Sequence, residues 1–450
     1  MTMASGKAAA RAEVFRFQER RFDPVTGTLE LAYGFERGEP LVETFVFPYA
    51  PWPEDPARRV AFGEACALLH LLAGVSYYKA ALPPVIDTGS IVLDTSLAHF
   101  LQTSWTEGLG EFAYVNELDL RDTIRFPVGE DVPPNPPVDG ALGLPDRALV
   151  AMGGGKDSLV SLELLRAADI EVQPVTVGNS ELIGDTVRAA GLPLLRIERT
   201  LAPRLLDMNR AGAWNGHVPV TAINMAILAC AALLYGYRWV VFSNERSAEE
   251  ATRLNADGQP VNHQYSKSLA FERAFGTQLA QRVAPDLEVF SLLRPLGEAA
   301  VTRRFADMTR YHPVFSSCNR NFHRDGSRIE GRWCGDCPKC RFTSLALAPW
   351  LSPEALTAIL GANLLDDPQQ ETGFRALASL GVEKPFECVG TVEESRALLA
   401  ALACSPAWKD FAVVKALAPE VSGTEPILAS LLSVDGPHCI PDEILARVAF

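Results

Sequence analysis

Short apolar runs alternate with helical segments from residue 147 to residue 243, and this alternation restricts the possible folds more than any other feature of the sequence. The apolar runs predict strands, and the segments between them predict helices. Strands that alternate with helices form parallel sheets covered on both faces, and such sheets bind ligands at the carboxyl ends of their strands. The predicted strands span 147–152, 172–177, 192–198 and 238–243, and the predicted helices span 158–168, 181–190 and 221–235.

A proline-rich segment, 127–146, predicts an interdomain linker, because its six prolines cannot continue a helix or a central strand. Before it, 1–126 predicts an α+β domain in which three strand-like runs form a small antiparallel sheet and a helix follows at 57–82. After it, 147–345 contains the alternating pattern, and 346–450 predicts a mostly helical region. The expected fold class is therefore α/β, with a parallel-sheet domain between an N-terminal α+β domain and a helical C-terminal region.

The acidic charge balance argues against a nucleic-acid partner. The chain has 41 basic and 55 acidic residues and a formal net charge of −14, whereas broad phosphate binding needs a basic face. The segment from Arg303 to Arg341, called the basic strip below, departs from this average with nine basic and four acidic residues. It is either a solvated face or a pocket for carboxylate or diphosphate groups, which arginine forks fit geometrically.

No segment of the sequence is predicted to cross a membrane. The longest apolar stretch, 222–235, has 14 residues and includes Asn224. A spanning helix needs roughly 17–25 residues, so a buried core helix is the better interpretation. The first residues have a basic character but lack the apolar run of a secretory signal. We therefore expect a cytoplasmic protein.

A glycine-rich loop follows the first predicted strand and opens the next helix. Its glycines let the backbone approach a phosphate closely, and the helix N-terminus offers free N–H groups. Asp157 can orient Mg²⁺, Ser158 can donate a hydrogen bond to a phosphate oxygen, and Lys156 adds a positive charge. The spacing fits neither a Walker A loop nor a dinucleotide fingerprint, and a glycine-rich turn without a ligand is the alternative. The candidate phosphate-binding residues are Gly153, Gly154, Gly155, Lys156, Asp157 and Ser158.

Polar residues also follow the last of these predicted strands, in the segment 243–247, and they include Asn244 and Glu245. Residues just past a parallel strand are well placed to contact a ligand. A structural loop that caps the next helix is the alternative. Asn244 and Glu245 are therefore candidate binding residues.

Four of the nine cysteines fall within 23 residues of one another: Cys318, Cys334, Cys337 and Cys340. Four thiolates suit a closed tetrahedral zinc site, because soft sulfur ligands hold Zn²⁺ without an open coordination position. Free or redox-active thiols and an iron–sulfur cluster are the alternatives. Nine cysteines in 450 residues are too few for a disulfide scaffold. The scattered ones are expected to be small core residues: Cys66, Cys230, Cys388, Cys404 and Cys439.

The loop resembles the S-G-G-x-D-S pyrophosphate loop of the N-type ATP pyrophosphatases, with Gly153 in place of the usual Ser. Members of that superfamily attack the α-phosphate of ATP with a substrate oxygen and release pyrophosphate. The resemblance implies a HUP-like fold for the parallel-sheet domain, ATP and Mg²⁺ as ligands, and a nucleotide site bordered by Asn244 and Glu245. The segment that starts at His217 and continues into TAINMAILACAALLYG resembles the 7-cyano-7-deazaguanine synthases, which carry a comparable four-cysteine zinc site.

The chain as a whole resembles the MurL family. The N-terminal α+β domain, the helical tail and the segments SNERSAEEATR and NHQYSKSLAFE carry this resemblance, which extends over most of the chain. MurL proteins are ATP-dependent epimerases of the peptidoglycan precursor UDP-MurNAc-L-Ala-L-Glu. The resemblance implies an anionic, UDP-linked muramoyl dipeptide as substrate. It also implies conversion of the terminal L-Glu to D-Glu through an acyl-adenylate, with release of AMP and pyrophosphate.

Such a reaction needs a base within hydrogen-bond reach of the glutamate α-proton. His217 and His263 are the first candidates, with Tyr265 and Lys267 behind them, and Asp157 is expected to be essential for pyrophosphate release. Three other functions stay open: a 7-cyano-7-deazaguanine synthase-like or other adenylating ligase, a tRNA-modifying enzyme, and a non-catalytic ATP sensor. The acidic composition argues against the tRNA-modifying enzyme.

Overall fold

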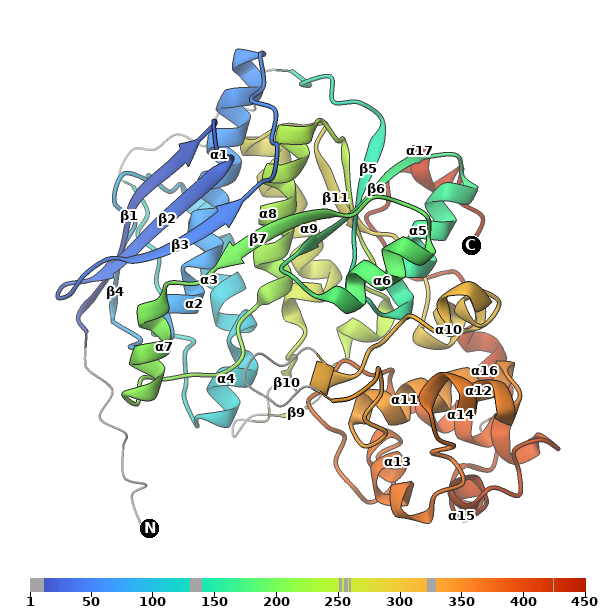
Figure 1. Ribbon diagram of the computed structural model, residues 1–450. Coiled ribbons are helices and arrows are strands. Elements are labelled where there is room, and N and C mark those ends of the chain that lie inside the picture. Colours follow the sequence, from blue (N-terminus) through green and yellow to red (C-terminus); the bar gives the residue numbers. More distant parts are fainter. Residues whose placement is uncertain are drawn as a thin grey trace, which may run out of the picture.

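The computed structural model describes residues 12–129, 140–250, 253–254, 258, 260–321, 329–423 and 425–450. Its central element is one nine-stranded sheet (Figure 1). In the order in which they lie side by side, its strands are β11 (Glu288–Ser291), β8 (Trp239–Phe242), β5 (Arg147–Ala151), β6 (Glu171–Val177), β7 (Leu195–Thr200), β3 (Leu41–Val46), β2 (Thr28–Phe35), β1 (Val14–Asp23) and β4 (Val85–Asp87).

The half of the sheet from β11 to β7 is parallel, which confirms the predicted α/β class and all four predicted strands. Alternate residues of β5 belong to two different hydrophobic clusters: Leu149 to one, and Ala148 and Val150 to the other. Both faces of this half are therefore covered, as the apolar runs predict. β11 was not predicted, because an apolar run of four residues is too short to distinguish from a loop or a helix end.

The half from β3 to β4 contains the predicted small sheet, and β1, β2 and β3 pair antiparallel as expected. This sheet does not stand alone. β3 pairs antiparallel with β7, with Thr44 opposite Thr200 and Val46 opposite Glu198. The pairing satisfies the backbone groups that two separate sheet edges would leave open. The two halves thus form one continuous sheet, whereas the predicted domain boundaries stay a prediction. Part of the predicted linker, 130–139, lies outside the described residues.

Ten helices pack around the sheet up to residue 306 in the described chain, and they include the three that the alternating pattern predicts. They are α1 (Pro56–Ala73), α2 (Val75–Tyr78), α3 (Thr95–Gly108), α4 (Gly110–Val115), α5 (Lys156–Ala167), α6 (Glu181–Ala189), α7 (Pro203–Arg210), α8 (Val220–Tyr235), α9 (Leu269–Arg282) and α10 (Glu298–Ala306). Next to α4, a two-stranded ribbon is formed by β9 (Arg253–Leu254) and β10 (Pro260–Val261).

The C-terminal region is helical, as predicted, and α11 to α16 gather in a lobe at the lower right of Figure 1. A capping box between Thr391 and Glu394 starts the longest of these helices. The helices are α11 (Pro338–Leu347), α12 (Pro353–Leu360), α13 (Glu371–Leu377), α14 (Val392–Cys404), α15 (Ala412–Val421), α16 (Glu425–Leu431) and α17 (Asp442–Leu445).

One helical stretch of the described chain, Pro56–Tyr78, is long and apolar enough to cross a membrane. Of its most apolar window, 83% is buried inside the protein. The stretch comprises α1 and α2, and α1 packs against α8 across the core. A mostly buried helix of this kind is typical of a protein core, and the stretch is therefore weak support for a membrane span.

A buried ion pair crosses the junction between β3 and β7, and we expect it to be a main stabiliser of the joined sheet. Nε of Arg199 lies 2.5 Å from Oε1 of Glu43, whose side chain is 0% exposed. Arg199→Leu removes the cation beside a buried carboxylate and should lower the free energy of unfolding by about 3–5 kcal/mol. Arg21→Leu breaks an exposed pair with Glu30 on the same sheet and should cost less than about 1 kcal/mol. Urea denaturation of both variants tests this, and equal losses would contradict it.

Candidate active site

The glycine-rich loop connects β5 to α5, as the sequence predicts. Gly154 has φ = +80°, a left-handed backbone conformation that favours glycine. A Cβ at Gly155 would lie 2.8 Å from Oγ of Ser317, so a side chain there would need its neighbour to move. In the described structure, nothing beyond the adjacent residues lies within 4 Å of a Cβ built at Gly153. Two of the glycines are thus needed for the shape of the loop, and Gly153 borders open space.

A cavity of about 380 Å³ lies at the carboxyl ends of β5 and β8. The loop forms one wall, and the segment 316–319 forms another, held by a 3.0 Å hydrogen bond from the Ser316 N–H to the Gly154 carbonyl. This is where a parallel sheet is expected to bind its ligand. The polar and loop residues that line the cavity include Gly153, Gly155, Asp157, Ser158, Asn244 and Lys339.

Lys156 lies beneath the loop and is not among the described residues that line the cavity. Its side chain is 6% exposed, and its ammonium forms ion pairs with Asp157, 2.5 Å from Oδ1, and with Glu298 at the start of α10. Burial raises the pKa of Glu298, and the charge of Lys156 opposes that shift. The positive charge that the sequence offers to a phosphate is therefore neutralised inside the protein.

Asn244 and Glu245 follow β8 but face different surroundings. Asn244 lines the cavity and donates a 3.0 Å hydrogen bond to Oγ of Ser291. Glu245 is buried and accepts hydrogen bonds from the backbone N–H and the hydroxyl of Ser247, at 2.5 and 2.6 Å. Burial, and next the nearby charge of Glu394, raise the pKa of Glu245. Asn244 can thus contact a ligand in the cavity, whereas Glu245 stabilises the segment after β8 through its hydrogen bonds with Ser247.

The structure brings His217 and His263 near one another, although they are 46 residues apart in the sequence and belong to no common motif. Burial, and next the charges of the nearby His263 and Lys267, lower the pKa of His217 to about 4. Nδ1 of His217 lies 3.4 Å from Oε2 of Glu111 in α4. His217 is therefore neutral at pH 7 and a weaker base than an ordinary histidine. Neither imidazole is among the described residues that line the loop cavity.

Cys388 lies beside this histidine pair, and sequence reasoning missed it. Nζ of Lys267 lies 2.9 Å from its Sγ. Burial opposes ionisation of the thiol, but the charge of Lys267, a hydrogen bond with His263 and the charge of Lys339 together hold the pKa of Cys388 well below its usual range. The expectation of a small core residue is thus wrong for Cys388, and it is also wrong for Cys404, which is exposed. No local motif marks it, because Lys267 lies 121 residues earlier in the chain.

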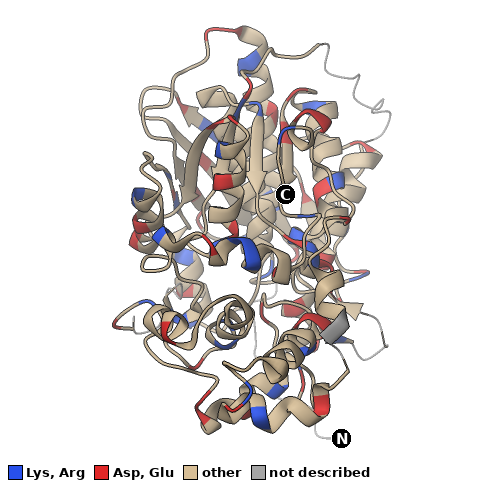
Figure 2. Cartoon of the chain, turned by 90° about the vertical axis from the view of Figure 1, so that its right-hand side faces the viewer, with Lys and Arg blue, Asp and Glu red and all other residues tan. Residues whose placement is uncertain are grey.

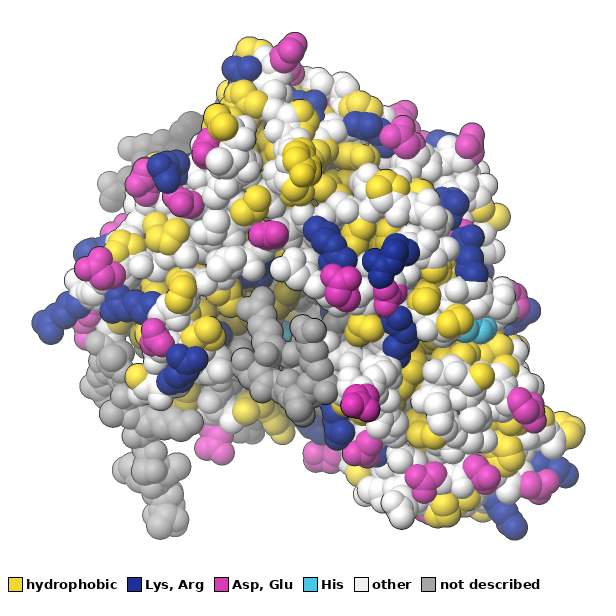
Figure 3. Space-filling model, in the orientation of Figure 1, with side chains coloured by type: hydrophobic (Ala, Val, Ile, Leu, Met, Phe, Trp, Pro, Cys, Tyr) yellow, Lys and Arg dark blue, Asp and Glu magenta, His cyan; other side chains and the backbone are white. Residues whose placement is uncertain are grey.

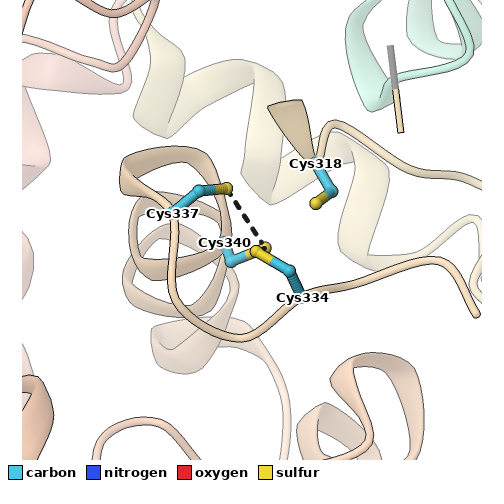
Figure 4. Close-up of side chains that lie close together, drawn as sticks. All are labelled: Cys318, Cys334, Cys337 and Cys340. Carbon is cyan, nitrogen blue, oxygen red and sulfur yellow. Dashed lines mark hydrogen bonds between the residues drawn. The ribbon is translucent and has the colours of Figure 1, made fainter. Parts of the chain in front are cut away.

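The four clustered cysteines come together at the start of α11 (Figure 4). Their sulfur atoms all lie within 4.8 Å of one another, and Sγ of Cys337 lies 3.4 Å from Sγ of Cys340. Cys337 is the N-cap of α11, Cys340 lies in its first turn, and Cys334 and Cys318 approach from the preceding chain. Among the described residues, these four sulfur atoms converge in an arrangement that fits a tetrahedral metal ion.

Protein carboxylates hold most of the described arginines of the basic strip, so these are not available as a pocket for anions. Figures 2 and 3 show basic and acidic positions interleaved on the faces in view. Arg324 and Arg328 lie outside the described residues. Lys339 is the residue by which the strip reaches the loop cavity. The ion pairs are Arg303–Asp307, Arg310–Glu163, Arg320–Asp336, Arg332–Asp185 and Arg341–Asp336.

The loop geometry predicts unequal effects of the same substitution at two neighbouring glycines. Gly154→Ala forces a side chain into the left-handed region and should lower the free energy of unfolding by about 1–2 kcal/mol. Gly153→Ala places its methyl group in open space and should change that free energy by less than about 0.5 kcal/mol. Thermal or urea denaturation of the two variants measures both effects. A Gly153→Ala variant as unstable as Gly154→Ala would show that the loop has another shape.

Comparison with known proteins covers nearly the whole chain. Residues 7–292 match the MurL N-terminal domain, and residues 314–430 match the MurL C-terminal domain. The UDP-N-acetyl-alpha-D-muramoyl-L-alanyl-L-glutamate epimerase of Xanthomonas oryzae pv. oryzae is 49% identical over 438 residues, which are 96% of each chain. Proteins of the same name from Micromonospora sp. and Salinispora tropica are 40% and 39% identical, over 96% of this chain and 96% and 94% of their own. With both domains matched and relatives aligned almost end to end, the chain belongs to the MurL family.

Proposed function

We propose that the chain epimerises the terminal glutamate of UDP-N-acetylmuramoyl-L-alanyl-L-glutamate, and so acts in peptidoglycan precursor synthesis. One observation carries the proposal: the 49% identity, along 96% of both chains, to a protein named as an epimerase of this compound. Two further relatives have the same name. The chain is accordingly an enzyme of the isomerase class, and its substrate is a UDP-linked muramoyl dipeptide.

The chemistry requires that the glutamate be activated before its α-proton leaves. Removing that proton beside a free carboxylate would place a second negative charge next to the first. In the proposed sequence, an α-carboxylate oxygen attacks the α-phosphate of ATP and pyrophosphate leaves. The acyl-adenylate has lost the carboxylate charge, so its carbonyl can delocalise the electron pair when a base removes the α-proton. A proton then enters from the opposite face, and hydrolysis yields the D-glutamyl product and AMP.

The cavity at the loop offers groups that suit ATP. The first backbone N–H groups of α5 and the hydroxyl of Ser158 can donate to phosphate oxygens. Asp157 and Asn244 line the same cavity, and Lys339 adds a positive charge. We assign Asp157 to Mg²⁺, which neutralises phosphate charge when bound. A HUP-like arrangement and kinship with the ATP pyrophosphatases are part of this proposal, supported by the strand–loop–helix geometry at Gly153–Ser158.

The relatives favour the epimerase over the other functions that the loop alone would allow. A 7-cyano-7-deazaguanine synthase-like ligase would also release AMP, and a non-catalytic sensor would bind ATP without turnover. Neither accounts for near end-to-end identity to proteins named as epimerases. We place the reaction in the cytoplasm, because UDP-linked muramoyl precursors are its proposed substrates.

Incubation with UDP-MurNAc-L-Ala-L-Glu, ATP and Mg²⁺ in D₂O should yield AMP, pyrophosphate and deuterium at the glutamate α-carbon. Asp157→Asn should lower pyrophosphate release at least about 100-fold, because it removes the proposed Mg²⁺ ligand. Asp207→Asn, at an exposed position of α7, is the matched control and should keep full activity. ADP in place of AMP, or an α-carbon without deuterium, would exclude the proposal. Full activity of Asp157→Asn would exclude the role of the loop.

We also propose that Cys318, Cys334, Cys337 and Cys340 hold a structural zinc ion. Three of the four are buried, and a thiolate cluster without an open ligand position suits a closed site that stabilises the fold. When bound, zinc would tie the start of α11 to the segment 316–319, which forms a wall of the loop cavity. The ion would thus support the shape of the active site and take no part in the reaction.

Purified protein should contain about one zinc ion per chain. Cys337→Ser should lose the metal and lower the melting temperature, because the N-cap of α11 is then no longer tied to the other thiolates. Cys404→Ser changes an exposed cysteine outside the cluster and is the matched control. It should keep the metal and the wild-type melting temperature. Elemental analysis by mass spectrometry and a thermal scan give the two readouts. Iron in place of zinc, or Cys337→Ser with its metal retained, would contradict the assignment.

A further inference from the structure

The adenylation step proposed above does not use a cluster of nucleophilic and basic side chains that lies near the loop cavity. It consists of Cys388, Lys267 and His263. The thiol of Cys388 is half-buried and lies 2.9 Å from the ammonium of Lys267. The ring of His263 is 7% exposed and packs edge-on against Phe386, with 5.7 Å between ring centroids. The three groups come from two segments that are more than 120 residues apart, so only the fold brings them together.

Two contacts connect this cluster to the loop cavity. Glu387, the residue before Cys388, accepts a 2.5 Å hydrogen bond from Nδ2 of Asn319, which lines the cavity. Lys339 also lines the cavity, and its charge acts on Cys388. The negative charges of Glu245 and of Asp157, which lines the cavity, also act on Lys267 and raise its pKa. These contacts place Cys388 next to a wall of the cavity in which the carboxylate is proposed to meet the α-phosphate.

The surroundings of Cys388 favour its thiolate. Lys267 supplies a positive charge at hydrogen-bond distance, and His263 forms a further hydrogen bond with the sulfur. The neighbouring carboxyl of Glu111 interacts with His217, 3.4 Å away, and with His263. A half-buried thiolate beside an ammonium and an imidazole is reactive, in contrast to the buried thiols of Cys66 and Cys230.

We propose that Cys388 is the base that removes the α-proton of the adenylated glutamate, an inference that rests on the proposed function. The Cα–H bond breaks and an S–H bond forms, while the electron pair moves into the enolate of the acyl-adenylate. Water supplies the proton that forms the new Cα–H bond on the opposite face. The hydroxide that remains takes the proton of the Cys388 thiol and restores the thiolate. Lys267 and His263 are positioning residues that hold the sulfur ionised.

The test compares adenylation with epimerisation in Cys388→Ala and Cys388→Ser. With UDP-MurNAc-L-Ala-L-Glu, ATP and Mg²⁺ in D₂O, both variants should release pyrophosphate at a rate within about threefold of the wild type. Formation of D-glutamyl product and deuterium uptake at the α-carbon should fall at least about 100-fold, as expected when a general base is lost. Cys404→Ala, which changes an exposed cysteine, is the control and should keep both activities.

Three results would overturn the inference or its basis, and they are distinguishable. D-glutamyl product formed by Cys388→Ala within about threefold of the wild-type rate would show that another residue removes the proton. Loss of pyrophosphate release together with epimerisation, in a Cys388→Ser variant with an unchanged melting temperature, would assign Cys388 to substrate binding. A wild-type enzyme that makes no AMP and pyrophosphate from this substrate would instead refute the proposed function itself.

Discussion

The buried ammonium of Lys156 holds together the parts of the protein that form the active site. It pairs with Asp157 on the loop and with Glu298 at the start of α10. Glu394 of α14 continues this network, because it accepts a 3.2 Å hydrogen bond from the backbone N–H of Ala299. A buried cation without partners would be very costly, so these carboxylates fix the loop against the C-terminal helices. The loop that lines the cavity is thereby connected through α10 to α14 of the C-terminal region.

Local sequence patterns were sufficient to predict four of the five strands in the parallel half of the sheet, all except β11, and the helical C-terminal region. The predicted strands 147–152 and 238–243 are apolar runs bounded by polar or glycine-rich segments. A pattern of this kind predicts a buried strand without any information about its neighbours. The pairing of β3 with β7 was not predictable in this way, because Thr44 and Thr200 meet through the fold and no local signal links them. The nine-stranded sheet therefore depends on long-range pairing as well as on local propensity.

The candidate site likewise contains residues that local sequence patterns predict and residues that only long-range contacts explain. The loop was predictable because its glycines, Asp157 and Ser158 are consecutive, and the four cysteines because their spacing is short. The inward direction of Lys156 depends on Glu298, 142 residues away, and the reactivity expected of Cys388 depends on Lys267. Residues whose chemistry is set by distant partners give no signal in the sequence. In this chain, those residues lie between the glycine-rich loop and the place where the α-proton is proposed to leave.

The central claim is that the substrate carboxylate is adenylated before the glutamate loses its proton. The most direct measurement uses UDP-MurNAc-L-Ala-L-Glu with ¹⁸O in the α-carboxylate of its glutamate, incubated with ATP and Mg²⁺ in ordinary water. Attack of a carboxylate oxygen on the α-phosphate, followed by hydrolysis at the carbonyl, should leave one ¹⁸O atom in each AMP formed, as read by mass spectrometry. Epimerised product accompanied by AMP without ¹⁸O would contradict the account.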